Sequence, residues 1–207
     1  NVTFTTNYFT FNGSTSTCRT TDWPTWNGQA HTMESWVYPT ATAQSGFIFE
    51  KGVSVNTQYS NFFDAGGNFY YRTIGLSTQD LTFTSSTYVT ANAWNHIVCT
   101  YNGAGTKTIY VNGVQIAQAT GLTGVIVSSP AGYNGSSIGI YGGGSGAASY
   151  YFSGRISVIR LYNAALTLAE VIRNYNADAS TYGKTPTGAG ITTTYDGTLV
   201  NGVLQYT

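Results

Sequence analysis

The sequence predicts an all-β protein that folds as an antiparallel sandwich or barrel. Short segments of alternating apolar and polar residues recur along the chain, with turn residues between them at a spacing of roughly 8 to 12 residues. Only one segment, near residue 170, has the pattern of a helix, so helices do not alternate with strands. The 207 residues are enough to bury a sizeable core within one domain.

A hairpin near the middle of the chain shows the pattern most clearly. Asn112-Gly113 predicts a type I′ turn, because both central residues of that turn must take positive φ. Pairing Val111 with Val114 then places Ile109 opposite Ile116 on an apolar face of the hairpin. Exposing that face would be unfavourable, so we expect a second layer of structure to cover it.

The same alternation predicts the other strands. The first lies within residues 1–11 and ends at the turn Asn12-Gly13, and residues 14–30 form a loop. Later strands are expected at residues 32–38, 46–52, 58–64, 68–74, around 81–83, and at 94–101, 106–111, 114–118, 136–141 and 151–162.

The longest of these strands, 151–162, is apolar on both faces. Alternation places Phe152, Ile156 and Val158 on one side. It places Ile159 and Leu161 on the other side. A strand with two apolar faces is typically covered on both, so we expect this strand to have little exposure.

The helix signal is nearly complete. Thr167 is the predicted N-cap, and Glu170, three residues later, is its capping-box partner. Leu166 can pack on Val171 as a hydrophobic staple, and the helix is expected to run to about Asn176. A polar Gly/Pro linker follows, with two short strands around residues 196–197 and 201–202.

Charge excludes several classes of partner. The chain has 8 Lys and Arg, 8 Asp and Glu, and a net charge of 0, and its cations are scattered singly. Nucleic acids require a basic surface, so they are not expected as partners. No apolar run approaches the ~20 residues needed to cross a bilayer, so membrane insertion is not expected. Near-zero charge removes electrostatic repulsion between copies, which favours a homo-oligomer or assembly.

The two cysteines leave two alternatives open. Cys18 and Cys99 lie in different segments and do not form a Cys-x-x-Cys motif. They could form one disulfide, but Cys99 lies within an apolar strand, where a cysteine is more often a small buried hydrophobic residue.

Six segments, in order, resemble the successive blocks of a laminin-G-like, concanavalin A-like domain. They are ESWVYP (34–39), FEKG (49–52), WNHIVCTYNG (94–103), IYVNGVQI (109–116), SIGIYGG (137–143) and FSGRISVIRLYNAALTLAEV (152–171). The resemblance implies a two-sheet antiparallel jelly-roll sandwich over residues 1–178 with one short helix near its end. Residues 179–207 then form a linker and short strands, packing on the domain or on a neighbouring subunit.

The resemblance also implies a class of function. Members mostly bind sugars, glycoproteins or partner proteins, often with a calcium ion at a sheet edge, and some relatives cleave glucans. Ser157 stands where the family usually has an acidic residue, which weakens any metal role for that position. The segment RNYNA (173–177) is similar to jelly-roll proteins carried by tailed bacteriophages.

Aromatic residues in predicted loops are the candidate ligand-binding residues. Indole and phenol rings stack on the apolar faces of sugars, and they also serve protein contacts. The alternative is that the loop tryptophans close one end of the sandwich. The candidates are Trp23, Trp26, Tyr133, Tyr141 and Tyr150.

Calcium is the one metal that the sequence leaves open. It binds backbone carbonyls together with one or two carboxylates, and Asp64, Asp80 and Asp22 lie in loops or at strand ends. The alternative is that each aspartate serves its own turn. His31 and His96 have no ligand spacing, so zinc is not expected, and His96 is expected to be packed or hydrogen-bonded.

Catalysis is not expected. Glycoside hydrolysis needs two carboxylates facing one site, whereas Glu34 stands alone on its strand. The sequence therefore predicts a non-catalytic, lectin-like adhesion module on an extracellular or virion surface, recognising a glycan, a glycoprotein or a protein partner. One alternative is a structural virion protein, a capsid decoration or fibre domain that acts through subunit contacts. A glucanase-type hydrolase is the disfavoured second alternative.

Overall fold

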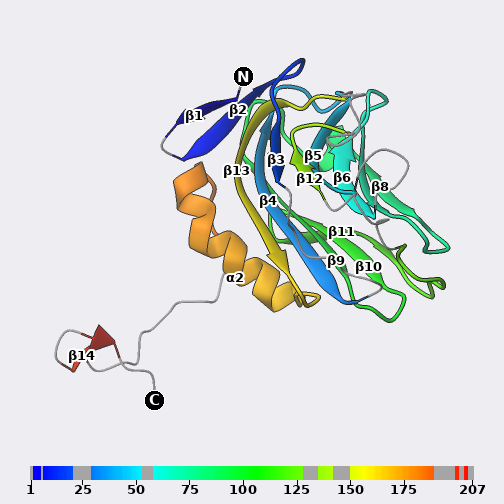
Figure 1. Cartoon of the computed structure of the whole chain (residues 1–207). Coiled ribbons are helices and arrows are strands. Elements are labelled where there is room, and N and C mark those ends of the chain that lie inside the picture. Colours follow the sequence, from blue (N-terminus) through cyan, green and yellow to red (C-terminus); the bar gives the residue numbers. More distant parts are fainter. Residues whose placement is uncertain are drawn as a thin grey trace.

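The computed structural model shows two antiparallel sheets packed face to face, with a helix outside one of them (Figure 1). The structure describes residues 2–5, 7–20, 29–52, 58–127, 135–141, 150–188, 199–200 and 203–204. This arrangement is the predicted two-sheet antiparallel sandwich.

The first sheet has seven strands in the order β1-β2-β13-β4-β9-β10-β11. All neighbouring strands in it are antiparallel. Its strands are β1 (Thr3–Thr5), β2 (Tyr8–Asn12), β13 (Ser153–Tyr162), β4 (His31–Pro39), β9 (Asn95–Tyr101), β10 (Lys107–Val111) and β11 (Val114–Ala119).

The second sheet has six strands in the order β3-β12-β5-β6-β7-β8, also antiparallel throughout. Its strands are β3 (Cys18–Thr20), β12 (Ser136–Ile138), β5 (Gly46–Lys51), β6 (Tyr59–Phe63), β7 (Asn68–Thr73) and β8 (Asp80–Thr84). A separate pair, β14 (Leu199–Val200) and β15 (Val203–Leu204), forms a two-stranded hairpin near the C-terminus.

The hydrophobic core lies between the two sheets. The first sheet contributes inward-facing residues such as Met33, Ile97 and Ile109, and the second contributes Phe63 and Tyr71, all buried. Two-residue alternation turns the neighbouring side chains to the outer faces. The predicted covering layer for the apolar face of the β10–β11 hairpin is therefore the six-stranded sheet.

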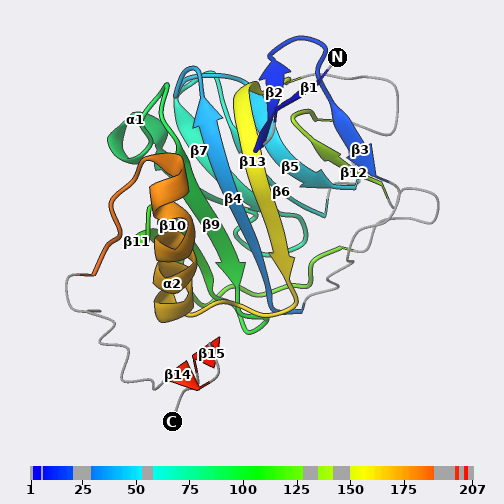
Figure 2. The same cartoon turned by 90° about the vertical axis from the view of Figure 1, so that its left-hand side faces the viewer.

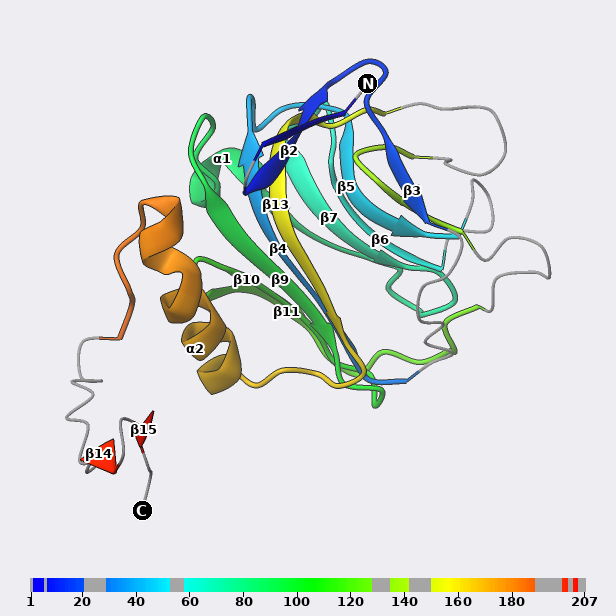
Figure 3. The same cartoon turned by 60° about the vertical axis from the view of Figure 1, so that its left-hand side comes forward.

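The helix α2 (Leu168–Ala179) covers the outer face of the seven-stranded sheet. Figure 2 shows it across β9 and β10, and Figure 3 shows it on the side away from the six-stranded sheet. Val171 packs against Val98 and Tyr110 beneath it. The capping box of Thr167 and Glu170 is confirmed, and Leu166 packs beside Val171 as predicted.

The helix ends later than the sequence predicts, at Ala179 instead of Asn176. A short 3-10 turn, Ser180–Tyr182, follows it, and the Tyr182 ring stacks on Trp36 at a centroid distance of 4.3 Å. This contact holds the start of the predicted linker on the domain. The division of the chain at residue 178 stays a prediction.

Several boundaries differ from the sequence prediction. The single predicted strand in residues 1–11 is two strands, β1 and β2, paired as a hairpin. The predicted loop 14–30 contains β3, which pairs with β12, and β12 ends at Ile138. A four-residue helix, α1 (Ser85–Tyr88), follows β8. The strand expected around residues 196–197 lies outside the described residues.

Two β-bulges also shift which residues face each other. In the β10–β11 hairpin, Val111 pairs with Val114 as predicted, but a bulge pairs Ile109 with Ala117 instead of Ile116. In β13, a bulge between Ile156 and Ile159 returns Ile159 to the core side. An inserted residue reverses the alternation that follows it, so regular spacing assigned these faces wrongly.

The remaining expectations concern cysteines and membranes. Cys18 and Cys99 are both free, and Cys99 is buried between the sheets, which supports its prediction as a small hydrophobic residue. None of the described helices has the length and apolar character that a membrane span requires.

Gly154 in β13 is expected to be intolerant of any side chain. Its φ is +145°, and a Cβ there would lie 2.1 Å from the carbonyl oxygen of Tyr38. Gly154→Ala should therefore lower the free energy of unfolding by at least about 2 kcal/mol in urea titrations. Gly121→Ala is the matched control, because Gly121 has φ +69° with nothing within 4 Å, and it should cost about 1 kcal/mol. Equal losses in the two variants would contradict the steric argument.

Candidate functional site

A row of stacked aromatic rings lies on the outer face of the six-stranded sheet. Strand pairing places Phe47 of β5 opposite Phe62 of β6, and Phe62 opposite Tyr70 of β7. The Phe47 and Phe62 rings stack with centroids 4.3 Å apart and an interplanar angle of 6°. Phe62 and Tyr70 stack at 4.8 Å and 2°. Directly paired residues on adjacent strands are neighbours on one face, so the register itself builds this row.

Two tyrosines extend the row beyond β5. The ring of Tyr141 lies 4.8 Å from that of Phe47, and the ring of Tyr150 lies 5.8 Å from that of Tyr141. The Phe47 amide donates a hydrogen bond to the carbonyl of Tyr150, which holds residue 150 against β5. The Tyr150 side chain is 53% exposed, so it presents its ring to solvent.

The other end of the row is charged. The guanidinium of Arg72 lies over the Phe62 ring, 5.0 Å from its centroid. Arg72 donates to both carboxylate oxygens of Asp80, from Nε at 2.7 Å and from Nη2 at 2.8 Å. These hydrogen bonds raise the pKa of Arg72, and they arise because β7 and β8 pair Arg72 directly with Asp80.

Asp64 follows β6 and supports the turn into β7. Its carboxylate accepts a hydrogen bond from the backbone amide of Asn68 at 2.8 Å and another from the hydroxyl of Tyr70. Burial acts to raise the pKa of Asp64, but the hydrogen bonds from Asn68 and Tyr70 outweigh it, and the pKa is lowered. Asp64 is therefore ionised at neutral pH.

Together these residues line a pocket of about 530 Å³, which we call the aromatic pocket. It is lined by Ser45, Phe47, Phe62, Phe63, Asp64, Tyr70, Arg72, Asp80, Tyr141 and Tyr150. Its floor contains the nearly buried rings of Phe47 and Phe62, and its rim carries the carboxylates of Asp64 and Asp80 and the guanidinium of Arg72. The pocket can hold a ligand with one apolar face and several polar groups at its edge.

The structure places four predicted site residues here. Tyr141, Tyr150, Asp64 and Asp80 all line the aromatic pocket, although they are far apart in the sequence. The other three predicted ligand-binding residues, together with Asp22, lie outside the described residues; these three are Trp23, Trp26 and Tyr133.

Sequence reasoning missed the floor of the aromatic pocket. Phe62 and Tyr70 lie in the two strands of a predicted hairpin, symmetrically about Gly66, so their pairing could have been found from the turn. The pairing of Phe47 with Phe62 could not have been found in this way, because the pairing of β5 with β6 includes a bulge between Phe47 and Phe49.

Calcium at Asp64 and Asp80 stays a prediction, and the donor set does not fit it well. Both oxygens of Asp80 accept from the Arg72 guanidinium, so a cation would have to displace a positive group. The described residues contain no cluster of three or more His, Cys, Asp or Glu side chains suited to a metal ion. Calcium prefers six to eight oxygen ligands, and two engaged carboxylates supply few of them.

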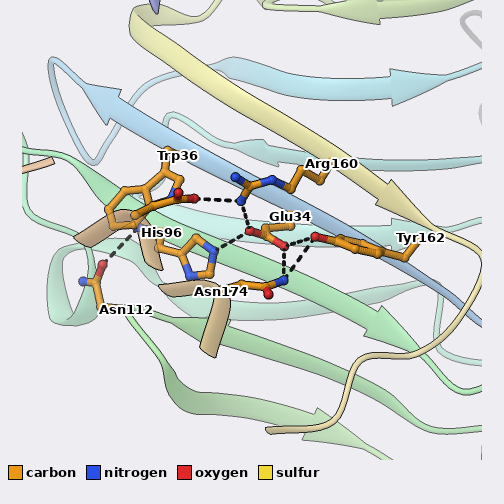
Figure 4. A network of polar contacts seen from close by, with 8 residues as sticks. Glu34, Trp36, His96, Asn112, Arg160, Tyr162 and Asn174 are labelled. Carbon is orange, nitrogen blue, oxygen red and sulfur yellow. Dashed lines mark hydrogen bonds and ion pairs between the residues drawn. The ribbon is translucent and has the colours of Figure 1, made fainter. Parts of the chain in front are cut away.

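A second polar cluster lies beneath α2, on the outer face of the seven-stranded sheet (Figure 4). The Glu34 side chain is completely buried there. Its Oε1 accepts from Arg160 at 2.5 Å and lies 3.2 Å from Nε2 of His96. Its Oε2 accepts from the Tyr162 hydroxyl at 2.8 Å and from Nδ2 of Asn174 at 2.9 Å. Glu34 is the only carboxylate on its strand, as predicted, but its side chain has hydrogen-bond partners from three other elements.

The same cluster ties the end of α2 to the sheet. Asp178 accepts hydrogen bonds from Arg160 at 2.8 Å and from the indole nitrogen of Trp36 at 3.3 Å. The prediction that His96 is hydrogen-bonded is confirmed by its contact with Glu34. His31 is also packed, between the sheets, where its Nε2 lies 2.8 Å from the Tyr71 hydroxyl.

The chemistry of Glu34 indicates a structural role. Burial acts to raise its pKa, but hydrogen bonds and charge from His96, with hydrogen bonds from Tyr162 and Asn174, lower the pKa to about 2. A carboxylate that holds its charge so firmly does not donate a proton, so it is unsuited to general acid catalysis. Glu34 anchors α2 instead.

Glu34 should make the protein sensitive to acid. Because its pKa falls from 4.5 to about 2 on folding, its contribution is fully present above pH 4.5 and is lost as the pH falls toward 2. The full shift corresponds to a free energy of about 3 kcal/mol. Unfolding titrations between pH 7 and pH 2.5 should show a smaller acid-dependent loss for Glu34→Gln than for the parent protein. Glu170→Gln at the start of α2 is the comparison: hydrogen bonds from Thr167 also lower the pKa of Glu170, but its carboxylate is exposed, so this variant should reduce the acid-dependent loss less than Glu34→Gln. Parallel profiles for parent and Glu34→Gln would contradict this assignment.

The comparisons with known proteins agree with this architecture. Residues 12–172 match the model of the concanavalin A-like lectin/glucanases superfamily. No curated protein matches the chain in sequence.

Solved structures of similar fold include receptor-binding domains of botulinum neurotoxins. The type G receptor binding domain is 17% identical with a TM-score of 0.64, and the match covers 86% of this chain and 45% of that one. The serotype D ligand binding domain in complex with N-acetylneuraminic acid is 14% identical with a TM-score of 0.66, over 86% and 45% of the two chains. This chain thus spans less than half of their length, and at such identities the likeness shows the fold alone. The family match over 12–172 and the two-sheet architecture together show that the chain belongs to the concanavalin A-like lectin/glucanase superfamily.

Proposed function

We propose that this protein is a non-catalytic, lectin-like binding module that recognises a glycan in the aromatic pocket, on an extracellular or virion surface. The observation that carries this proposal is the stacked row of Phe47, Phe62 and Tyr70, bounded at one end by Arg72 and Asp80. Its partners would be glycans or glycoproteins, and neither nucleic acid nor membrane lipid is proposed.

The chemistry of sugars matches this arrangement. One face of a pyranose ring presents C–H groups that pack on aromatic rings, while its hydroxyls point outward to hydrogen-bond partners. The volume of about 530 Å³ lies within the range of pockets that hold small ligands. Phe47 and Phe62 are each less than a tenth exposed and stack face to face, so they form a fixed floor, whereas the Tyr150 ring, which is 53% exposed, is open to a sugar.

The similar structures support a binding role in general terms. One is named as a receptor binding domain and another as a ligand binding domain in complex with N-acetylneuraminic acid. Those names describe the neurotoxin domains, and the proposal for this chain depends on its own pocket.

The hydrolase alternative is disfavoured by the carboxylates themselves. A glycosidase needs a carboxylic acid whose pKa is raised, so that it can protonate the leaving group. The pKa values of Asp64 and Glu34 are both lowered, and Asp80 is paired with Arg72. Asp64 and Glu34 are therefore hydrogen-bond acceptors and not the proton donors that a glycosidase needs.

Removal of the aromatic rings should abolish glycan recognition. Tyr70→Ala and Tyr150→Ala remove rings from opposite ends of the row, and each should weaken binding on a glycan array at least tenfold, or about 1.4 kcal/mol. Tyr88→Ala is the matched control, because Tyr88 is 44% exposed and does not line the pocket. The proposal fails if the parent protein binds no glycan, or if both pocket variants bind as the parent does.

A structural role through subunit contacts remains the second candidate, and the β1–β2 hairpin favours it. This hairpin forms one edge of the seven-stranded sheet. Phe4 is 63% exposed and Phe9 is 37% exposed, and their rings pair with centroids 4.9 Å apart. Exposed aromatic pairs at a sheet edge are typical contact points for another chain, as in a capsid decoration or fibre domain.

The oligomeric state distinguishes this candidate from the first. If Phe4 and Phe9 form a subunit contact, the parent protein should sediment as an oligomer at micromolar concentration, and Phe4→Ser should shift it to monomer. Glycan binding by Tyr70 and Tyr150 should be unaffected by Phe4→Ser. A parent protein that sediments as a monomer would contradict self-association through this edge.

A further inference from the structure

We infer that the aromatic pocket selects uncharged sugars and disfavours acidic sugars such as sialic acid. The observation behind this inference is that the charged rim of the pocket holds one more carboxylate than cation. The inference rests on the proposed function, because it names the class of glycan that the same pocket accepts.

The charge balance follows from the lining residues. Among the residues that line the aromatic pocket, Asp64 and Asp80 carry negative charge and Arg72 carries positive charge. The Asp64 carboxylate is held ionised by hydrogen bonds from the Asn68 amide and the Tyr70 hydroxyl. The rim therefore has a net charge of about −1 at neutral pH, by the ordinary charges of these groups.

Arg72 does not offset this charge for a ligand, because Asp80 already engages it. The two groups form a bidentate pair at 2.7 Å and 2.8 Å, each with a side chain 31% exposed. An incoming carboxylate would have to compete with Asp80 for the guanidinium or use its remaining edge. In either position the ligand carboxylate would share the pocket with the carboxylates of Asp64 and Asp80, and like charges within one pocket repel each other.

Uncharged sugars are not repelled by the carboxylates of the rim. Carboxylates are strong acceptors for hydroxyl groups, so the outward lone pairs of Asp80 can bind sugar hydroxyls without any charge conflict. Nη1 of Arg72, which Asp80 does not use, can donate to a ring or hydroxyl oxygen. The aromatic lining of the pocket, with its exposed Tyr150 ring, supplies the apolar surface, and apolar packing does not depend on charge at the sugar's edge.

The neurotoxin domain of similar fold that is in complex with N-acetylneuraminic acid provides a contrast. A shared sandwich does not carry over the chemistry of a site at 14% identity. The charges on the rim of this pocket point to a different class of ligand.

The experiment compares neutral glycans with their sialylated counterparts on one array, using the whole chain. The probes are lactose and N-acetyllactosamine, the same two cores carrying terminal sialic acid, and a panel of neutral hexose oligosaccharides. The expected result is binding to at least one neutral glycan, with at least tenfold weaker binding to sialylated forms. Equal or tighter binding of sialylated forms would overturn the inference while leaving the proposed function intact. Silence across the array would overturn both.

A charge variant tests whether the rim carboxylates cause the preference for neutral sugars. Asp80→Asn removes one carboxylate and releases the Arg72 guanidinium, so it should improve binding of sialylated glycans relative to neutral ones by about tenfold or more. Glu170→Gln makes the same change in net charge at an exposed position on α2, outside the pocket, and should leave the ratio unchanged. An unchanged ratio in a folded Asp80→Asn protein that still binds neutral glycans would overturn the proposed cause, as would an equal change in both variants.

Discussion

Alternate side chains of β4 lie in two different environments, the core between the sheets and the polar cluster beneath α2, and both layers are held together through this strand. Met33 and Val37 lie between the sheets, whereas Glu34 and Trp36 lie beneath α2. A buried carboxylate is tolerated only when its hydrogen bonds are satisfied, so Glu34 requires donors from β9, β13 and α2 at the same time. That requirement fixes where the helix lies on the sheet and closes the outer face of the seven-stranded sheet.

The two outer faces consequently have different roles. One is covered by α2 and the Tyr182 ring, and its polar groups satisfy one another. The other, on the six-stranded sheet, is not covered by α2 (Figure 3), and its aromatic row opens into the aromatic pocket. A rigid sheet that holds rings in register provides a preorganised surface for a ligand. The buried carboxylate of Glu34 therefore has a structural role, whereas the partly exposed carboxylates of Asp64 and Asp80 line the pocket.

Much of the fold could be predicted from the sequence, because its signals are local. The turn at Asn112-Gly113 and the capping box at Thr167 each depend on a few adjacent residues, and both are confirmed. The errors arise at the bulges in β13 and the β10–β11 hairpin, where one extra residue reverses the faces. Regular alternation has no signal for an inserted residue, since its cause is the pairing with another strand.

The candidate site was also predicted only in part, because some of its features are local in the sequence and others depend on strand pairing. The residue types, that is, aromatic side chains and a few aspartates on a chain of low charge, are read directly from the sequence, and they predicted Tyr141, Tyr150, Asp64 and Asp80. The pairing of the strands was needed to show that these four residues share one pocket and that Phe47, Phe62 and Tyr70 form its floor. The tertiary structure also shows that Arg72 is paired with Asp80 and that Glu34 lies beneath a helix. Residue types and local turns depend on neighbours in the chain, so the sequence reveals them. The charge balance of the pocket and the burial of Glu34 depend on strands that pair across the sheet, so they could not be predicted from the sequence.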